Sequence, residues 1–137
     1  MKVQDNIFFL LNKASQSGTR HLAEQLKSFA VTPSQGMILV LLLEEDAVTS
    51  ARLGERAGLD SATLTGIIDR LERLNLLTRH KNPSDRRAIR VCLTEEGKQK
   101  AHAIQVATVK ANHTFLDDLS DIEKKIFRAL LRRVRRV

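Results

Sequence analysis

One stretch of the chain, Ser50 to Leu93, constrains the fold more than any other. Its residue pattern predicts a helix, a glycine turn, a second helix and a basic hairpin, in that order. The second helix runs from Ser61 to Leu74, and its apolar residues recur at helical spacing. They form a single stripe of Leu64, Ile67, Ile68, Leu71 and Leu74. A helix of this kind buries the stripe and leaves its opposite face to contact another surface.

The opposite face of the second helix is small and polar near its start. Small side chains let a helix approach another surface closely, and hydroxyl groups bond to phosphates or to base edges. Two arginines farther along are predicted to contact the same surface or to form local ion pairs. The predicted contact residues are Ser61, Ala62, Thr63, Thr65, Gly66, Arg70 and Arg73.

A shorter helix precedes it, capped at its start by Thr49 and ended by Gly58. Glycine readily takes the left-handed conformation that a tight turn needs, and Asp60 then caps the second helix. Two helices joined by so short a turn cross at a steep angle, which is the helix-turn-helix arrangement. Taken alone, such a pair serves structure about as often as nucleic-acid binding.

A basic hairpin follows the helix pair. Residues 76–78 and 89–93 have the pattern of extended segments, and the turn-forming residues lie between them. Arginine at the tip of a hairpin suits a narrow minor groove, whose negative potential attracts guanidinium groups. A solvated basic loop is the alternative, but the position directly after the helix pair favours the groove. The predicted contact residues are Arg79, Lys81, Asp85, Arg86, Arg87 and Arg90.

Two runs of residues carry a specific resemblance. They are residues 59–74, LDSATLTGIIDRLERL, and residues 85–97, DRRAIRVCLTEEG. Both resemble the multiple antibiotic resistance regulator (MarR) family, whose hairpin signature is Asp, any residue, Arg, followed by Leu-Thr and then Gly. The resemblance implies a homodimeric winged helix-turn-helix regulator. Most such regulators are repressors, and many are released from DNA by a small aromatic or phenolic effector.

The family resemblance also implies roles for single residues. It assigns Arg87 to the minor groove and Asp85 to holding the shape of the hairpin, which we call the wing (residues 76–93). The second helix (residues 61–74) becomes the recognition helix. Gly66 stands where many members have arginine, which removes one frequent polar contact. Asn75 replaces a common glycine, and asparagine tolerates the left-handed conformation.

The segments on either side of residues 31–94 are predicted to join two subunits. Within one MarR-type domain of 137 residues, residues 31–94 form the DNA-binding lobe, and residues 1–30 and 95–137 form dimerisation helices. The first helix begins at about Gln4, and Phe8 and Phe9 widen its apolar stripe beyond one packed face. Either they cover the subunit's own core or they meet a partner, and the family analogy favours the partner. The predicted dimer contacts are Ile7, Phe8, Phe9, Leu11, Ile122, Ile126, Phe127 and Leu130.

Capping residues mark the remaining helices. Thr32 to Gln35 predicts the start of a helix that reaches about Glu44 and is apolar on most sides, so we expect it at the centre, with Met37 as core filler. Thr94 and Ser120 cap two further helices. The arginine run at the end of the last helix is predicted to offset the helix dipole rather than to bind DNA. It comprises Arg128, Arg132, Arg133, Arg135 and Arg136.

Composition narrows the function classes. The formal net charge of +7 indicates a polyanionic partner, and the basic residues gather around a shaped motif, so nucleic acid is favoured over a membrane surface. No Phe, Trp or Tyr lies in residues 50–93, which argues against stacking on single strands. No nucleophile elbow, phosphate loop or metal-ligand spacing of histidines is found. We therefore predict no enzyme activity, no metal and no cofactor.

Cys92 is the only cysteine, so no internal disulfide can form, which fits a reducing cytoplasm. The absence of a signal-like start and of a long apolar run favours the same location. Arginines near Cys92 are expected to favour its thiolate, which leaves a redox-responsive regulator open. The family's peroxide sensors, however, carry their reactive cysteine near the N-terminus.

The sequence thus predicts a mainly α-helical fold with a small β-hairpin wing and a sequence-specific, double-stranded DNA-binding transcription regulator. Two-fold symmetry predicts a palindromic operator with half-sites about 34 Å apart. The competing interpretation is an architectural DNA-binding protein without an effector. Both classes bind DNA with steep salt dependence, so sequence specificity has to separate them.

Overall fold

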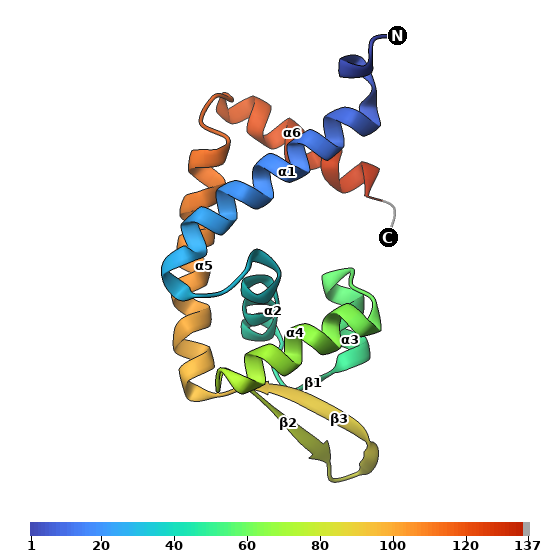
Figure 1. Ribbon diagram of the computed structural model, residues 1–137, viewed down its shortest axis with the longest axis vertical. Coiled ribbons are helices and arrows are strands. Elements are labelled where there is room, and N and C mark those ends of the chain that lie inside the picture. Colours follow the sequence, from blue (N-terminus) through green and yellow to red (C-terminus); the bar gives the residue numbers. More distant parts are fainter. Residues whose placement is uncertain (136–137) are drawn as a thin grey trace.

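The computed structural model describes residues 1–135, except the side chains of Arg86 and Arg87. Helix α5 forms a spine, with a lobe of α2, α3, α4 and a small sheet beside its first half (Figure 1). Helices α1 and α6 extend beyond the other half, which confirms the predicted mainly α-helical fold with a wing. The elements are η1 (Val3–Asp5), α1 (Ile7–Leu26), η2 (Lys27–Phe29), α2 (Pro33–Glu44), β1 (Val48–Thr49), α3 (Ser50–Ala57), α4 (Ser61–Arg73), β2 (Leu77–Asn82), β3 (Asp85–Leu93), α5 (Glu95–Phe115) and α6 (Asp121–Val134).

Local capping explains where most helices begin. Thr32 with Gln35 and Ser120 with Glu123 form complete capping boxes, as predicted. The predicted start of the first helix at Gln4 is wrong. The Asn6 side chain accepts hydrogen bonds from the backbone N–H groups of Phe8 and Phe9, so α1 starts at Ile7. Residues 3–5 form a separate 3-10 turn.

A single apolar core holds the lobe, α1 and α5 together. Helix α2 lies at its centre, as predicted, and contacts α1, α3, α4, α5 and β3. Met37 is an exception, because its side chain is 48% exposed, so its prediction as core filler is wrong. The largest fully buried side chains are Leu26, Ile38, Leu39, Leu42, Leu53, Ile68, Leu71, Leu76, Leu77, Val91 and Ile104.

The wing belongs to a three-stranded antiparallel sheet with the order β1-β3-β2. Strand β1 pairs Val48 with Val91 and was not predicted, because two residues carry no periodic signal. The hairpin strands also reach farther toward the tip than predicted, to Asn82 and from Asp85. Backbone pairing continues into this part, where the side-chain pattern does not alternate, and the Asn82 side chain accepts hydrogen bonds from the Ser84 backbone N–H and hydroxyl.

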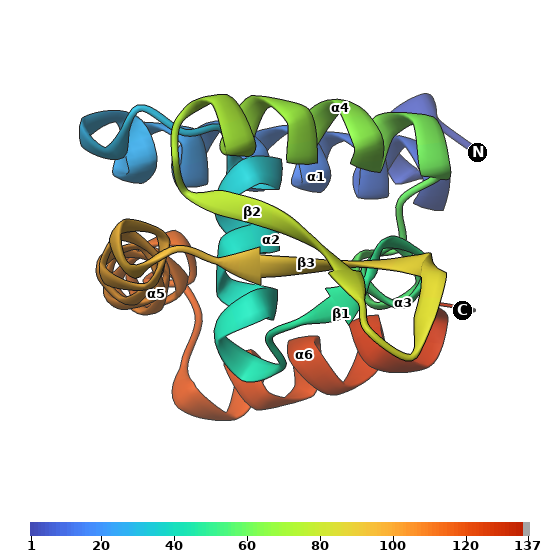
Figure 2. The same cartoon turned by 90° about the horizontal axis from the view of Figure 1, so that it is seen from below.

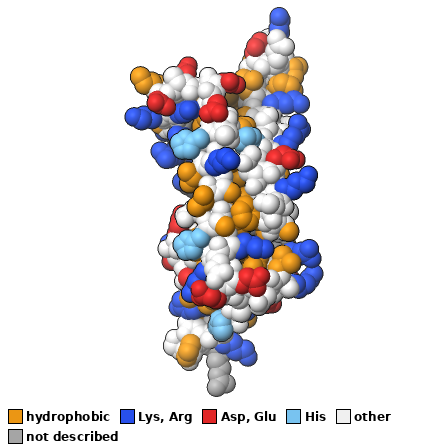
Figure 3. Space-filling view, turned by 90° about the vertical axis from the view of Figure 1, so that its left-hand side faces the viewer, with side chains coloured by type: hydrophobic (Ala, Val, Ile, Leu, Met, Phe, Trp, Pro, Cys, Tyr) orange, Lys and Arg blue, Asp and Glu red, His pale blue; other side chains and the backbone are white. Residues whose placement is uncertain are grey.

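Helices α1 and α6 cross in the projection of Figure 1 but lie on opposite sides of the molecule in Figure 2. Figure 3 views the side formed by α5, where apolar side chains run through the middle of the face and charged groups gather above and below. Among the described residues, no single helix is both long and apolar enough to cross a membrane. Two consecutive helical segments, Ile7–Phe29 and Pro33–Glu44, meet the length and composition criteria only when taken together, and the chain bends by 74° between them.

Candidate nucleic-acid interface

The helix-turn-helix unit has the geometry that its residues predict. Gly58 ends α3 in the left-handed region, with φ of 65°. Gly54 lets the helices approach, since a Cβ there would lie 3.3 Å from both the Leu59 carbonyl oxygen and the Leu64 side chain. Asp60 accepts a hydrogen bond from the Thr63 backbone N–H and so caps α4.

All seven predicted contact residues of α4 are exposed in the structure. Two of the hydroxyl groups already donate within the helix: Thr63 to the Asp60 carboxylate at 2.7 Å and Thr65 to the Ser61 carbonyl at 2.8 Å. The hydrogen bonds from Thr63 also lower the pKa of Asp60. These threonines therefore present methyl groups and acceptor lone pairs, which suit thymine methyls and amino groups on base edges better than phosphates.

Helix α4 and the hairpin lie at the same end of the molecule, with the tip projecting past the helix (Figures 1 and 2). A helix and a hairpin arranged in this way can engage adjacent grooves of one duplex. Lys81, Asp85 and Arg90 are exposed on the hairpin. The side chains of Arg86 and Arg87 lie outside the described part of the chain, as does Arg136 at the C-terminus.

Two of the predicted wing contacts, Arg79 and Arg90, also form hydrogen bonds within the protein. Arg79 is only 27% exposed, and its guanidinium pairs with Asp69 and Glu72 of α4. Two of its N–H donors thus serve these carboxylates, and a contact between Arg79 and DNA stays a prediction. Arg90 donates a hydrogen bond of 2.7 Å to the Ala47 carbonyl oxygen, which ties β3 to the connection between α2 and β1.

Cys92 is half-buried on β3. Burial first, and then the nearby Asp46 carboxylate, raise the pKa of its thiol, and Arg90 only partly opposes them. The expectation that arginines favour the thiolate is therefore wrong, because desolvation and Asp46 outweigh them. No group of three or more metal-ligating side chains occurs in the part of the chain that the structure describes.

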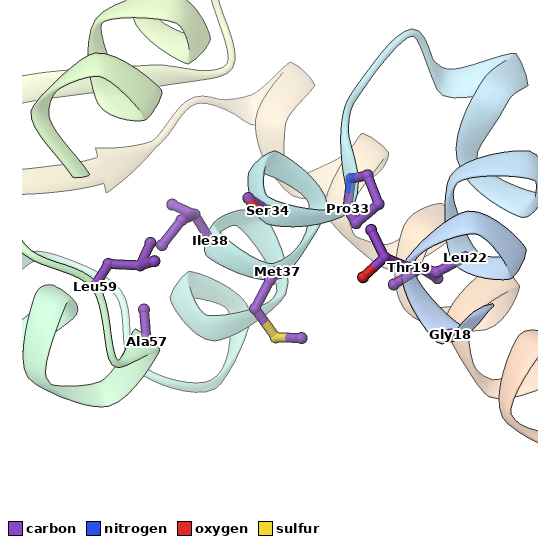
Figure 4. Close-up of a pocket in the computed structure, with 9 residues that line it drawn as sticks. All are labelled: Gly18, Thr19, Leu22, Pro33, Ser34, Met37, Ile38, Ala57 and Leu59. Atoms are coloured by element: carbon purple, nitrogen blue, oxygen red, sulfur yellow. The ribbon is translucent and has the colours of Figure 1, made fainter. Parts of the chain in front are cut away.

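A cavity of about 300 Å³ separates α1 from the helix-turn-helix (Figure 4). Helices α1 and α2 form most of its wall, and the residues on either side of Gly58 complete it. Its lining residues were not predicted from the sequence, because its wall joins three separate segments. Its lining residues are Gly18, Thr19, Leu22, Pro33, Ser34, Met37, Ile38, Ala57 and Leu59.

Several known proteins are similar to this chain in sequence and in fold. The model of the MarR family matches residues 31–89. The organic hydroperoxide resistance transcriptional regulator of Bacillus subtilis is 31% identical over 95% of this chain and 90% of its own length. The PcaV regulator from Streptomyces coelicolor, solved with its natural ligand, has a TM-score of 0.86 and 27% identity, over 98% of this chain and 94% of its own. A MarR variant from E. coli, solved with operator DNA, has a TM-score of 0.86 and 25% identity, over 93% of this chain and 91% of its own.

Proposed function

This chain belongs to the MarR family of transcriptional regulators, and from that premise we propose that it is an operator-binding repressor released by a small molecule. Its relatives are DNA-binding regulators and not enzymes, and we assign the chain to the same class. The observation that carries the proposal is the exposed face of α4 beside the projecting hairpin, on a chain with a net charge of +7. The MarR variant with operator DNA supports the same use of this fold.

A homodimer supplies the symmetry that a palindromic operator requires. Most of the predicted dimer contacts are exposed in a single chain, including Phe8 at 77% and Ile122 at 70%, whereas Phe127 is half-buried. The alternative that Phe8 and Phe9 cover the subunit's own core is wrong, because both lie on the surface. So much exposed apolar surface on α1 and α6 favours a second copy as its cover.

Selection of bound sequences from a random duplex pool at physiological salt tests the repressor proposal. We expect a palindrome with half-sites about one helical turn apart. Arg87→Ala should then weaken binding to that palindrome by about tenfold or more, because an arginine that enters the minor groove is lost. Binding is measured by fluorescence anisotropy, and the dimer is confirmed in the same preparation.

The architectural alternative gives a different result in that experiment. It predicts that no duplex sequence is enriched above nonspecific binding. Arg87→Ala would then weaken DNA binding only through the loss of one positive charge. An enriched sequence that the Arg87→Ala protein binds as tightly as the wild type would remove the wing from the mechanism.

The cavity in Figure 4 is our proposed effector site, because it lies between α1 and the helix-turn-helix. Its lining is mainly apolar, and its polar side chains are the hydroxyl groups of Thr19 and Ser34. No lysine or arginine is among the described lining residues, so a carboxylate would enter without a cationic partner. A volume of about 300 Å³ suits a single-ring molecule. These features favour a neutral phenol-like effector over an aromatic acid.

We therefore expect 4-hydroxybenzamide to release the operator at a lower concentration than 4-hydroxybenzoate, which has the same shape but carries a charge. Thr19→Val should raise the concentration of the amide needed for release severalfold, because it removes a hydroxyl without changing volume. Release is followed by fluorescence anisotropy of the selected duplex. Stronger release by the benzoate would mean that a cation from outside this lining completes the site.

A further inference from the structure

One side-chain contact joins the wing directly to the recognition helix. Arg79 on β2 donates from Nη2 to Oδ1 of Asp69 at 2.6 Å and from Nη1 to Oε1 of Glu72 at 2.9 Å. Asp69 and Glu72 are three residues apart, so both carboxylates project from the same side of the last turns of α4. One guanidinium thus bridges two carboxylates of the helix with separate donors.

Arg79 is partly buried in this contact, and its carboxylate partners Asp69 and Glu72 are 42% and 43% exposed. Its side chain is 27% exposed, and the hydrogen bond to Asp69 is the main reason that the pKa of Arg79 is raised. Partial burial weakens screening by water and salt, and two simultaneous hydrogen bonds fix the plane of the guanidinium. The geometry therefore resists rotation of β2 relative to α4.

The contact adds to the anchoring of the wing at its base. Helix α4 continues into β2 through the turn of residues 74–76, in which Asn75 has φ of 58° and the Leu76 backbone N–H donates to the Leu71 carbonyl oxygen at 3.0 Å. On the other side of the sheet, Arg90 ties β3 to the Ala47 carbonyl oxygen. Arg79 and Arg90 thus hold the base of the hairpin to two different parts of the lobe.

We propose that Arg79 is a positioning residue for operator binding. Through Asp69 and Glu72 it sets the angle between α4 and the hairpin, so that both reach their grooves on one duplex together. The inference rests on the proposed function, since it concerns how the two DNA-contacting elements act jointly. It replaces the simpler role of Arg79 as one more cation that contacts phosphate.

Neutralising Asp69 separates these two roles by the sign of the effect. Asp69→Asn removes a negative charge from a DNA-facing helix and weakens the bridge, which leaves Arg79 ion-paired with the Glu72 carboxylate alone of the two. If Arg79 binds phosphate, operator binding must become tighter. If Arg79 positions the wing, operator binding should become about tenfold weaker despite the more favourable net charge. Glu55→Gln, which neutralises an exposed carboxylate on α3, is the matched control and should not weaken binding.

The salt dependence of binding gives a second readout that a change in stability would not imitate. Arg79→Gln should weaken operator binding by a similar factor while the slope of log affinity against log salt stays unchanged. Loss of a direct phosphate contact would instead reduce that slope by about one. Arg79→Lys keeps the charge but cannot bridge two carboxylates, so it should not restore wild-type binding.

The double variant completes the test. If the residues act as one unit, Asp69→Asn with Arg79→Gln should bind no more weakly than either single variant. Tighter or unchanged binding by Asp69→Asn, or a reduced salt slope for Arg79→Gln, would overturn the positioning role. Failure of the wild-type protein to select any duplex would overturn the proposed function instead, so the two failures are distinguishable. Thermal unfolding and size-exclusion chromatography confirm that each variant is a folded dimer.

Discussion

Gly97→Ala is expected to destabilise the protein by about 3 kcal/mol or more, the upper range for forcing an extra methyl group into a packed site. Gly97 is buried in the first turn of α5, and a Cβ there would lie 2.0 Å from the carbonyl oxygen of Leu76 and 2.9 Å from its carbonyl carbon. Both are backbone atoms, so no rotamer change can relieve the clash. The free energy of unfolding in urea measures the effect.

Hydrogen bonds make this junction unable to move aside. The Thr94 hydroxyl donates to the Asn75 carbonyl at 2.7 Å, and the Thr94 backbone N–H donates to the Leu76 carbonyl at 3.1 Å. Gly66→Ala is the matched control, because a Cβ there meets nothing within 4 Å on an exposed turn of α4. It should stabilise the protein by up to about 1 kcal/mol. Equal stability of the Gly97→Ala and wild-type proteins would mean that α5 can shift along the turn.

The second large effect is expected when charge is placed on α6. Ile122→Glu with Ile126→Glu should dissociate the dimer, because both side chains belong to the predicted interface and are 70% and 53% exposed in a single chain. The fold of each subunit should survive, since neither side chain is in the core. Loss of the second half-site contact should lower operator affinity about a hundredfold or more. Sedimentation equilibrium measures the assembly and fluorescence anisotropy the affinity.

Ile89→Glu provides the control for the measurement of assembly. Ile89 is 45% exposed but lies on β3 in the DNA-binding lobe, outside the predicted dimerisation helices. The dimer should persist in this variant. A dimer that withstands both glutamates on α6 would exclude that face from the interface.

The helices of this protein were predictable because their signals are local. Thr32 with Gln35, Ser120 with Glu123, and Gly58 each act within one turn of the chain, and the structure has them as predicted. The start of α1 was not predictable from its apolar stripe, because the residue that fixes it, Asn6, is polar and lies just before the stripe. A single polar side chain that accepts two backbone N–H groups outweighed that pattern.

The candidate site was predictable in its parts but not in its internal contacts. The exposed face of α4 follows from helical periodicity, whereas the pairing of Arg79 with Asp69 depends on how the wing folds back. Gly97 belongs to the family signature in the sequence, but the reason that a glycine is needed there, the close approach of the Leu76 carbonyl oxygen, involves a residue 21 positions earlier. Contacts of this range carry no periodic signal in one sequence.

Ala57 and Leu59 line the cavity and also belong to the helix-turn-helix, so a molecule in the cavity contacts the DNA-binding unit directly. Binding free energies are reciprocal, so if an occupant of the cavity lowers operator affinity by some factor, the operator lowers the occupant's affinity by the same factor. DNA is then a competitor of the effector, although the two never touch. The concentration of effector needed for a response should therefore rise with the number of operator copies present.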